Sequence, residues 1–210
     1  MMKKILFPLI VLICSILFFS CTSEIGVSLN KDGSVDVRFE GVSGVAFATL
    51  IRSAAGVEEG DVVFDTREIT TELTKNNFSS VNVVSKKGTD LSITMKDLQK
   101  KSPLFTSGVA SVNEGKLFAT LSADRLLNFY NASDEEVVSF LDMLLAPVFN
   151  DEVLSIDDYL DTIASFYGKE AADEINASNF KITLTNADGT SRVFTIPIAK
   201  LLTINEVIEM

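Results

Sequence analysis

Two cysteines, an absence of histidine and an excess of acidic side chains limit the chemistry that this chain of 210 residues can perform. Histidine is the most common general base in enzymes, and without it neither a Ser-His nor a Cys-His pair can form. Carboxylate, lysine or tyrosine chemistry stays open, because the chain holds 29 Asp and Glu residues against 18 Lys and Arg. The sequence therefore favours a protein that is not an enzyme.

Two groups of neighbouring acidic residues could carry carboxylate chemistry. Asp157, Asp158 and Asp161 offer oxygen ligands of the kind that hard cations prefer, but Asp157 and Asp158 point to different sides of a predicted helix. The acids of residues 58–61 could form a hydrolytic pair, yet the sequence identifies no matching acid elsewhere. We interpret the first group as a solvated helical face, and we predict no metal ion, no cofactor and no catalytic residue.

The segment before Cys21 is a candidate export signal. Lys3 and Lys4 precede a mainly apolar, uncharged run over residues 5–19, and the small residue Ser20 follows the run. The run is shorter than the roughly 20 residues that a membrane-spanning helix needs. A basic start, a short apolar run and a small residue before the processing point are typical of a secretory signal peptide. We therefore expect residues 1–20 to be a signal peptide, and an uncleaved membrane anchor is the alternative.

Residues 17–21, LFFSC, resemble the lipobox of bacterial lipoproteins. The resemblance implies that Leu17 and Ser20, together with the basic start, are read during signal-peptide recognition. It also implies that Cys21 is linked to diacylglycerol and becomes the new N-terminus. Phe18 departs from the family pattern, in which Leu usually stands at that place, and relaxed lipoboxes such as those of spirochaetes accept bulky apolar residues there.

Acylation at Cys21, for example with palmitate, would anchor the chain to a membrane. Cys14 is the competing cysteine, but it follows Ile13, which is too large for the position before cleavage. Residues 21–24 form the lipidated cysteine and a tether, and the three residues after Cys21 span about 10 Å when extended. We expect residues 25–210 to form one envelope domain held close to a bacterial cell membrane or outer membrane, facing the periplasm or the cell exterior.

The charge of the processed chain excludes some partners. Loss of residues 1–20 removes two lysines and no acid, so the formal net charge falls from −11 to −13. Strong acidity argues against nucleic-acid binding and against adsorption to anionic headgroups by charge alone. Membrane association is therefore expected through the lipid anchor.

Alternating apolar and polar residues predict four β-hairpins. Segments between them are predicted helices: residues 42–55, residues 65–76 with Asp65 or Thr66 at the N-cap, and a segment that starts at an N-cap on Ser155 and continues toward Ile175, with Gly168 weakening its middle. Residues 97–108 are predicted to be a connection. Because Asp-Gly is favoured in tight turns, the similar sequences of the first and last hairpins indicate shared turn chemistry. We expect an α+β fold in which antiparallel hairpins form a sheet, helices pack on one face, and the first and last hairpins lie near each other. The predicted hairpins cover residues 25–39, 81–95, 109–121 and 180–198.

The most apolar predicted helix covers residues 134–149. From Val137 to Phe149 its only polar residues are Ser139 and Asp142, so the helix must be buried on most sides or contact a membrane or ligand. It is either a central core helix or one wall of an apolar cavity for an acyl chain. The candidate ligand contacts are Phe140, Leu141, Leu144, Leu145 and Val148.

The order of hairpin, helix and second hairpin over residues 25–96 is similar to that of envelope lipoproteins of the lipoprotein-M type, with Asn77-Phe78 leading into the second hairpin. The resemblance implies binding of envelope lipids or glycolipids and transfers no functional residue. We therefore expect a membrane-anchored lipoprotein with a non-enzymatic binding role, for lipid or another apolar ligand. A structural lipoprotein that contacts an envelope or host protein is the alternative.

Overall fold

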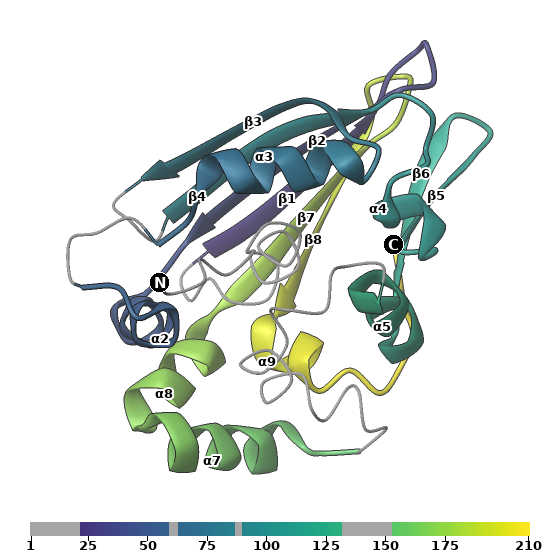
Figure 1. Cartoon of the computed structure of the whole chain (residues 1–210). Coiled ribbons are helices and arrows are strands. Elements are labelled where there is room, and N and C mark those ends of the chain that lie inside the picture. Colours follow the sequence, from purple (N-terminus) through teal and green to yellow (C-terminus); the bar gives the residue numbers. More distant parts are fainter. Residues whose placement is uncertain (1–21, 59–62, 87–89, 132–152) are drawn as a thin grey trace.

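Six strands form the main sheet in the order β3-β4-β2-β1-β7-β8 (Figure 1). The computed structural model describes residues 22–58, 63–86, 90–131 and 153–210. All neighbouring strands of this sheet are antiparallel except β1 and β7, which run parallel. The six strands are β1 (Thr22–Leu29), β2 (Val35–Val42), β3 (Ser79–Lys86), β4 (Asp90–Asp97), β7 (Asn179–Thr185) and β8 (Ser191–Pro197).

The α+β class is confirmed and the hairpins of the main sheet are antiparallel as expected, while the first and last hairpins meet through the parallel pair β1 and β7. The first and last hairpins, β1-β2 and β7-β8, lie side by side as expected, with Val27 opposite Leu184. Alternation within a hairpin determines which side chains are buried, but it does not determine the direction in which two distant hairpins meet. The sequence pattern therefore predicted the neighbours and not their relative direction.

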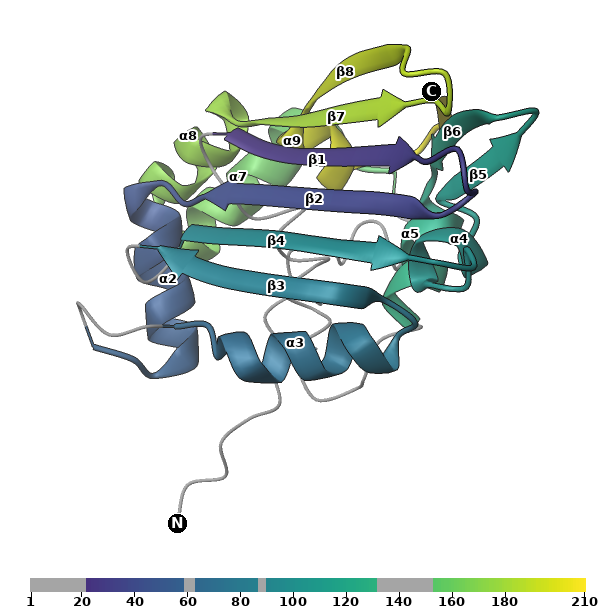
Figure 2. The same cartoon turned by 90° about the horizontal axis from the view of Figure 1, so that it is seen from above.

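The inner strands of the main sheet, β4, β2, β1 and β7, each have a mainly apolar and a mainly polar face. In β1, Ile25, Val27 and Leu29 are buried, while the residues between them are half-buried. Ion pairs lie on the polar face, where Lys181 Nζ is 3.1 Å from Glu24 Oε1 and Lys96 Nζ is 3.5 Å from an oxygen of Asp36. Helices cover the apolar face, which lies behind the strands in Figure 2.

A second, smaller sheet contains β5 (Ala110–Asn113), β6 (Lys116–Leu121) and β9 (Ile208–Glu209). The predicted third hairpin is confirmed as β5-β6, but it does not belong to the main sheet. Strand β9 pairs antiparallel with β6, where Leu121 lies opposite Ile208. This short terminal strand was not predicted, because two paired residues carry no periodic signal.

Helices α2, α3 and α7 begin near their predicted starts, whereas α4 lies in a segment that was predicted to be a connection. Asp65 caps α3 as expected, accepting the N–H groups of Arg67 and Glu68, and Ser155 caps α7 by accepting the N–H of Asp158 at 3.1 Å. At Gly168, where φ is 93°, the helix predicted to continue toward Ile175 breaks into α7 and α8. The helices are α2 (Val45–Ala55), α3 (Thr66–Lys75), α4 (Pro103–Thr106), α5 (Ala123–Asn131), α7 (Ile156–Tyr167), α8 (Lys169–Ala177) and α9 (Ile198–Leu202).

Two turns of closely similar structure close the first and last hairpins. In the first turn, Ser34 N–H and Oγ both donate to Asp32 Oδ1, and in the last turn Thr190 donates the same two bonds to Asp188. The glycine that follows each aspartate has a positive φ, 83° at residue 33 and 87° at residue 189. L-residues with a side chain rarely adopt that conformation, so the Asp-Gly sequence determines the turn.

Candidate functional site

The residues with predicted functional roles lie outside the described part of the chain. Lys3, Lys4, Leu17, Ser20 and Cys21 belong to residues 1–21, and the candidate apolar contacts belong to residues 132–152. Their predicted roles therefore stay predictions. The contacts concerned are Phe140, Leu141, Leu144, Leu145 and Val148.

The described residues form an apolar cavity of about 60 Å³ between the main sheet and the smaller sheet. Its floor is the buried face of the parallel pair β1 and β7, and its other walls come from β5, β6, α4, α5 and the residue before β5. All described lining residues are apolar, and none of them titrates. They are Ile25, Val27, Leu104, Val109, Ala110, Ala119, Leu121, Leu126, Phe129, Phe180, Ile182 and Leu184.

A pair of alanines explains why space remains between the two sheets. Ala110 on β5 lies directly opposite Ala119 on β6, and both line the cavity although they are only 5% and 7% exposed. Directly opposed side chains share one face of a sheet. Two methyl groups therefore stand where larger side chains would reach the floor formed by β1 and β7.

Two residues of the cavity wall are only half-buried. Leu126 and Val109 are half-buried, whereas the floor residues Ile182 and Leu184 are buried. The Arg125 guanidinium donates to the carbonyl of Gly108 and ties α5 to the residue before Val109. This bond therefore links the two segments that carry the half-buried wall residues.

A second depression, of about 220 Å³, lies beside the end of β4 and is polar. Asp97 lies in its wall with its carboxylate already engaged, since it accepts the N–H groups of Gln99 at 3.0 Å, Lys101 at 3.2 Å and Ser102 at 2.9 Å. Burial opposes ionisation, but these hydrogen bonds hold the pKa of the Asp97 carboxyl below its usual value. Asp97 therefore organises the loop that follows β4.

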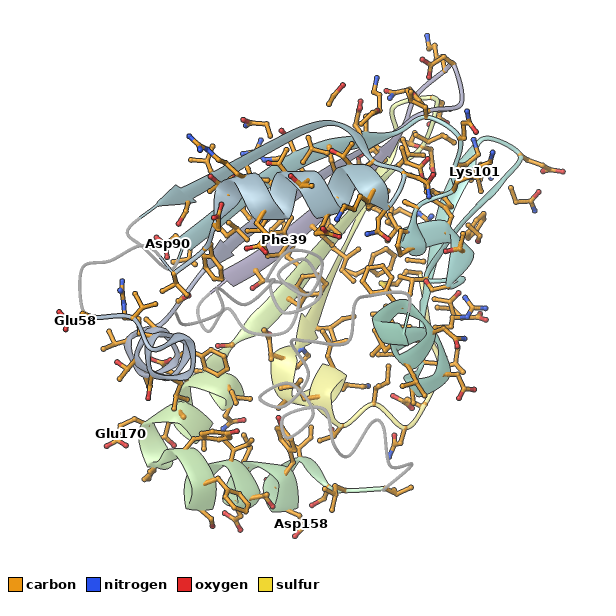
Figure 3. All side chains as sticks on the ribbon, viewed as in Figure 1. Phe39, Glu58, Asp90, Lys101, Asp158 and Glu170 are labelled. Atoms are coloured by element: carbon orange, nitrogen blue, oxygen red, sulfur yellow. The ribbon has the colours of Figure 1, made fainter. Side chains whose placement is uncertain are left out.

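The acidic groups considered for chemistry are exposed where they are described. Asp157, Asp158 and Asp161 lie on the solvent side of α7, and Asp158 points away from the protein (Figure 3). Glu58 is also exposed, while residues 59–62 lie outside the described ranges. Within the described ranges, no group of three or more acidic side chains is arranged to hold a metal ion.

The sequence did not predict the cavity, because its lining comes from four separate stretches of the chain. The alternation of apolar residues predicted that Ile25 and Ile182 would be buried, but not that their strands would be neighbours. The only local signal is the small size of Ala110 and Ala119 in otherwise apolar strand positions. The small size of these two residues indicates a cavity only once the packing of the two sheets is known.

Comparison with family models, with curated proteins and with solved structures found no match for this chain. Among the helices that the structure describes, none has the length and apolar character needed to cross a membrane.

Proposed function

We propose that this protein is a lipid-anchored envelope protein that binds the apolar end of a ligand, such as an acyl chain, without catalysing a reaction. The apolar cavity between the two sheets is the observation that carries the proposal. Ligand sites are concave and mostly apolar, and this cavity has both properties. The lipobox-like stretch ending at Cys21 supports the membrane location.

The size of the cavity limits what it holds. A protein cavity of about 150 Å³ accommodates a benzene molecule, whereas this one has about 60 Å³. It therefore takes only the end of an acyl chain, and we propose that the remainder leaves on the side of Val109 and Leu126, which are half-buried.

The apolar lining also supports a role without catalysis. General acid–base chemistry requires a titratable side chain within hydrogen-bonding distance of the reacting group. No described residue of the cavity wall has such a side chain. The wall can exclude water from a ligand and select it by shape, and none of its described residues carries a group that transfers a proton.

Native mass spectrometry of the full-length protein, extracted from membranes with a mild detergent, tests the proposal. We expect a non-covalently bound lipid at near-stoichiometric occupancy. Ala119→Val adds two methyl groups to the cavity wall while suiting a strand, so this variant should lose at least half of the bound lipid. Ala164→Val on α7 is the matched control, because Ala164 packs against the core without lining the cavity.

Lipid-free wild-type protein, or equal lipid occupancy in Ala119→Val and wild type, would overturn the proposal. Circular dichroism must show that both variants are folded before their occupancies are compared. Recovery of a stoichiometric protein partner in place of the lipid would instead favour the protein-contacting alternative.

A further inference from the structure

Helix α2 presents an uncharged stripe to solvent. Val45, Thr49 and Ser53 are all exposed and recur at every fourth residue, so they lie on one side of the helix. Val45 is 83% exposed, which is the largest value among the exposed large apolar residues of the described chain. Phe47 buries the opposite side of the helix in the core.

Two polar side chains of α2, one on this stripe and one beside it, have partners within the protein. Thr49 Oγ1 donates to the carbonyl of Val45 at 2.9 Å, and the guanidinium of Arg52 donates to the carbonyl of Glu58 at 3.0 Å. Arg52 is the only charged residue of α2, and the helix contains no acid although the whole chain has a formal net charge of −11. The hydroxyl proton of Thr49 on the stripe therefore has an acceptor within the helix.

The stripe lies at the end of the main sheet where the chain enters it. Thr22, the first residue of β1, pairs with Val42 at the end of β2, and Val42 is 45% exposed. Helix α2 starts three residues later, at Val45, and lies across this end of the sheet (Figures 1 and 2). Cys21 directly precedes Thr22 in the sequence, so a lipid on Cys21 enters the bilayer within about 10 Å of Val42.

We propose that Val42 and the exposed side of α2 form a membrane-contacting surface that seats the domain on the headgroup region of the bilayer. The inference rests on the lipid anchor of the proposed function, because acylation at Cys21 is what brings this end of the sheet to the membrane. The surface acts on orientation: it places α2 against the lipid and the turn at Lys31 away from it. Residues Thr22–Leu29 separate these two ends, and seven steps of about 3.3 Å make roughly 23 Å.

The surrounding charges specify which lipid the surface contacts. Glu58 follows α2, Glu170 lies on the neighbouring helix α8, and Asp90 accepts the N–H of Ser43 just before α2 (Figure 3). These carboxylates repel anionic headgroups. The surface therefore fits zwitterionic lipid, with the valines at the boundary between headgroups and acyl chains.

Fluorescence quenching by lipid measures this orientation. The full-length acylated protein is reconstituted into phosphatidylcholine vesicles whose acyl chains carry a bromine quencher. A bimane dye is attached to Val45→Cys or, as the matched reporter at the other end of β1, to Lys31→Cys. We expect at least twofold stronger quenching at residue 45 than at residue 31. With the dye at Ser53→Cys, the added substitution Val45→Asp should reduce quenching by half or more.

Val193→Asp is the control substitution, since Val193 is a 57% exposed valine on β8 and lies outside the proposed surface. It should leave the quenching at residue 53 unchanged. Metabolic labelling with palmitate in the same protein separates the two claims. Acylated protein with equal quenching at residues 45 and 31 would overturn the membrane-contacting surface and leave the anchor in place. Protein without the acyl label would overturn the anchor and, with it, this inference.

Discussion

Glu174 on α8 caps the start of α2 across the protein, with one carboxylate oxygen 3.0 Å from the backbone nitrogen of Phe47. The other oxygen accepts the N–H of Ala46 at 2.8 Å, although the two residues are 128 positions apart in the sequence. No side chain of residue 44 can cap this helix, since that residue is glycine. A distant carboxylate therefore provides the cap and fixes α2 against α8.

Replacement of Glu174 by alanine should lower the free energy of unfolding by about 1–2 kcal/mol, because two N–H groups at a helix start lose their acceptor. Chemical denaturation of the full chain measures the change. Glu170→Ala is the control on the same helix, where the side chain is exposed, and it should change stability by less than about 0.5 kcal/mol. Equal losses in the two variants would show that the cap does not stabilise the fold.

A second pair of variants compares the two similar turns. Each turn has an asparagine whose side-chain nitrogen donates to the hydroxyl four residues later, from Asn30 to Ser34 and from Asn186 to Thr190. Asn186 Oδ1 additionally accepts the N–H of the buried residue Leu117 at 2.9 Å and so joins the main sheet to the smaller one.

Asn186→Ala should therefore destabilise the protein by about 1–2 kcal/mol more than Asn30→Ala, because it leaves the Leu117 N–H without its acceptor. Thermal unfolding of the two variants side by side gives the difference. Hydrogen exchange at Leu117 should rise in Asn186→Ala and stay at the wild-type rate in Asn30→Ala. Unchanged exchange in both variants would show that this bond does not hold the two sheets together.

The carboxyl of Asp97 should make the free energy of unfolding depend on pH in the acidic range. Its pKa in the folded protein lies below its usual value because three backbone N–H groups donate to the carboxylate. The ionised Asp97 carboxylate therefore stabilises the folded protein fully above the pKa of about 3.9 that the group has in the unfolded chain. This stabilisation is lost as the pH falls through the lower pKa that the group has in the folded protein.

Asp97→Asn should cost about 2 kcal/mol at neutral pH, and the difference from wild type should shrink below about pH 4. Denaturation at a series of pH values checks the prediction. The control is Asp173→Asn, an exposed aspartate paired with Lys169 on α8, which should show a much smaller effect at neutral pH. A cost for Asp97→Asn that stays constant with pH would contradict the assigned role of the charge.

The lipid anchor is tested at the two cysteines of the chain. Cys21→Ala should abolish metabolic labelling with radioactive palmitate, because no thiol remains at the position that the lipobox-like stretch presents. Cys14→Ala should keep the label, since Ile13 before it is too large for processing. Autoradiography of the immunoprecipitated protein distinguishes the variants. A label that persists in Cys21→Ala would show that acylation, if present, occurs elsewhere.

Local signals in the sequence predicted much of the fold. The Asp-Gly turns, the caps at Asp65 and Ser155 and the alternation within each hairpin act over a few residues, and the structure confirms them. Long-range relationships left no such signal. The parallel pairing of Ile25 with Ile182 and the cap from Glu174 to α2 join distant segments through contacts that many apolar or acidic residues could make.

The cavity of the candidate site also could not be predicted from local sequence signals. Its wall requires the pairing of Ala110 with Ala119, the docking of α5 and the adjacency of β1 and β7, and each of these is a tertiary relationship. The sequence did predict that an apolar ligand was chemically plausible, from the apolar character of residues 137–149. Those residues lie outside the described ranges, and the lining that the structure describes belongs to other elements.

Photocrosslinking tests the central claim most directly. A fatty acid with a diazirine at the end of its chain is incubated with the full-length protein, irradiated, and located by peptide mass spectrometry. We expect crosslinks on peptides that contain Leu104, Ala119 or Leu126, and we expect their yield to fall by at least half in Ala119→Val but not in Ala164→Val. Crosslinks confined to peptides outside the cavity wall, or an unchanged yield in Ala119→Val, would contradict the assignment of this cavity as the binding site.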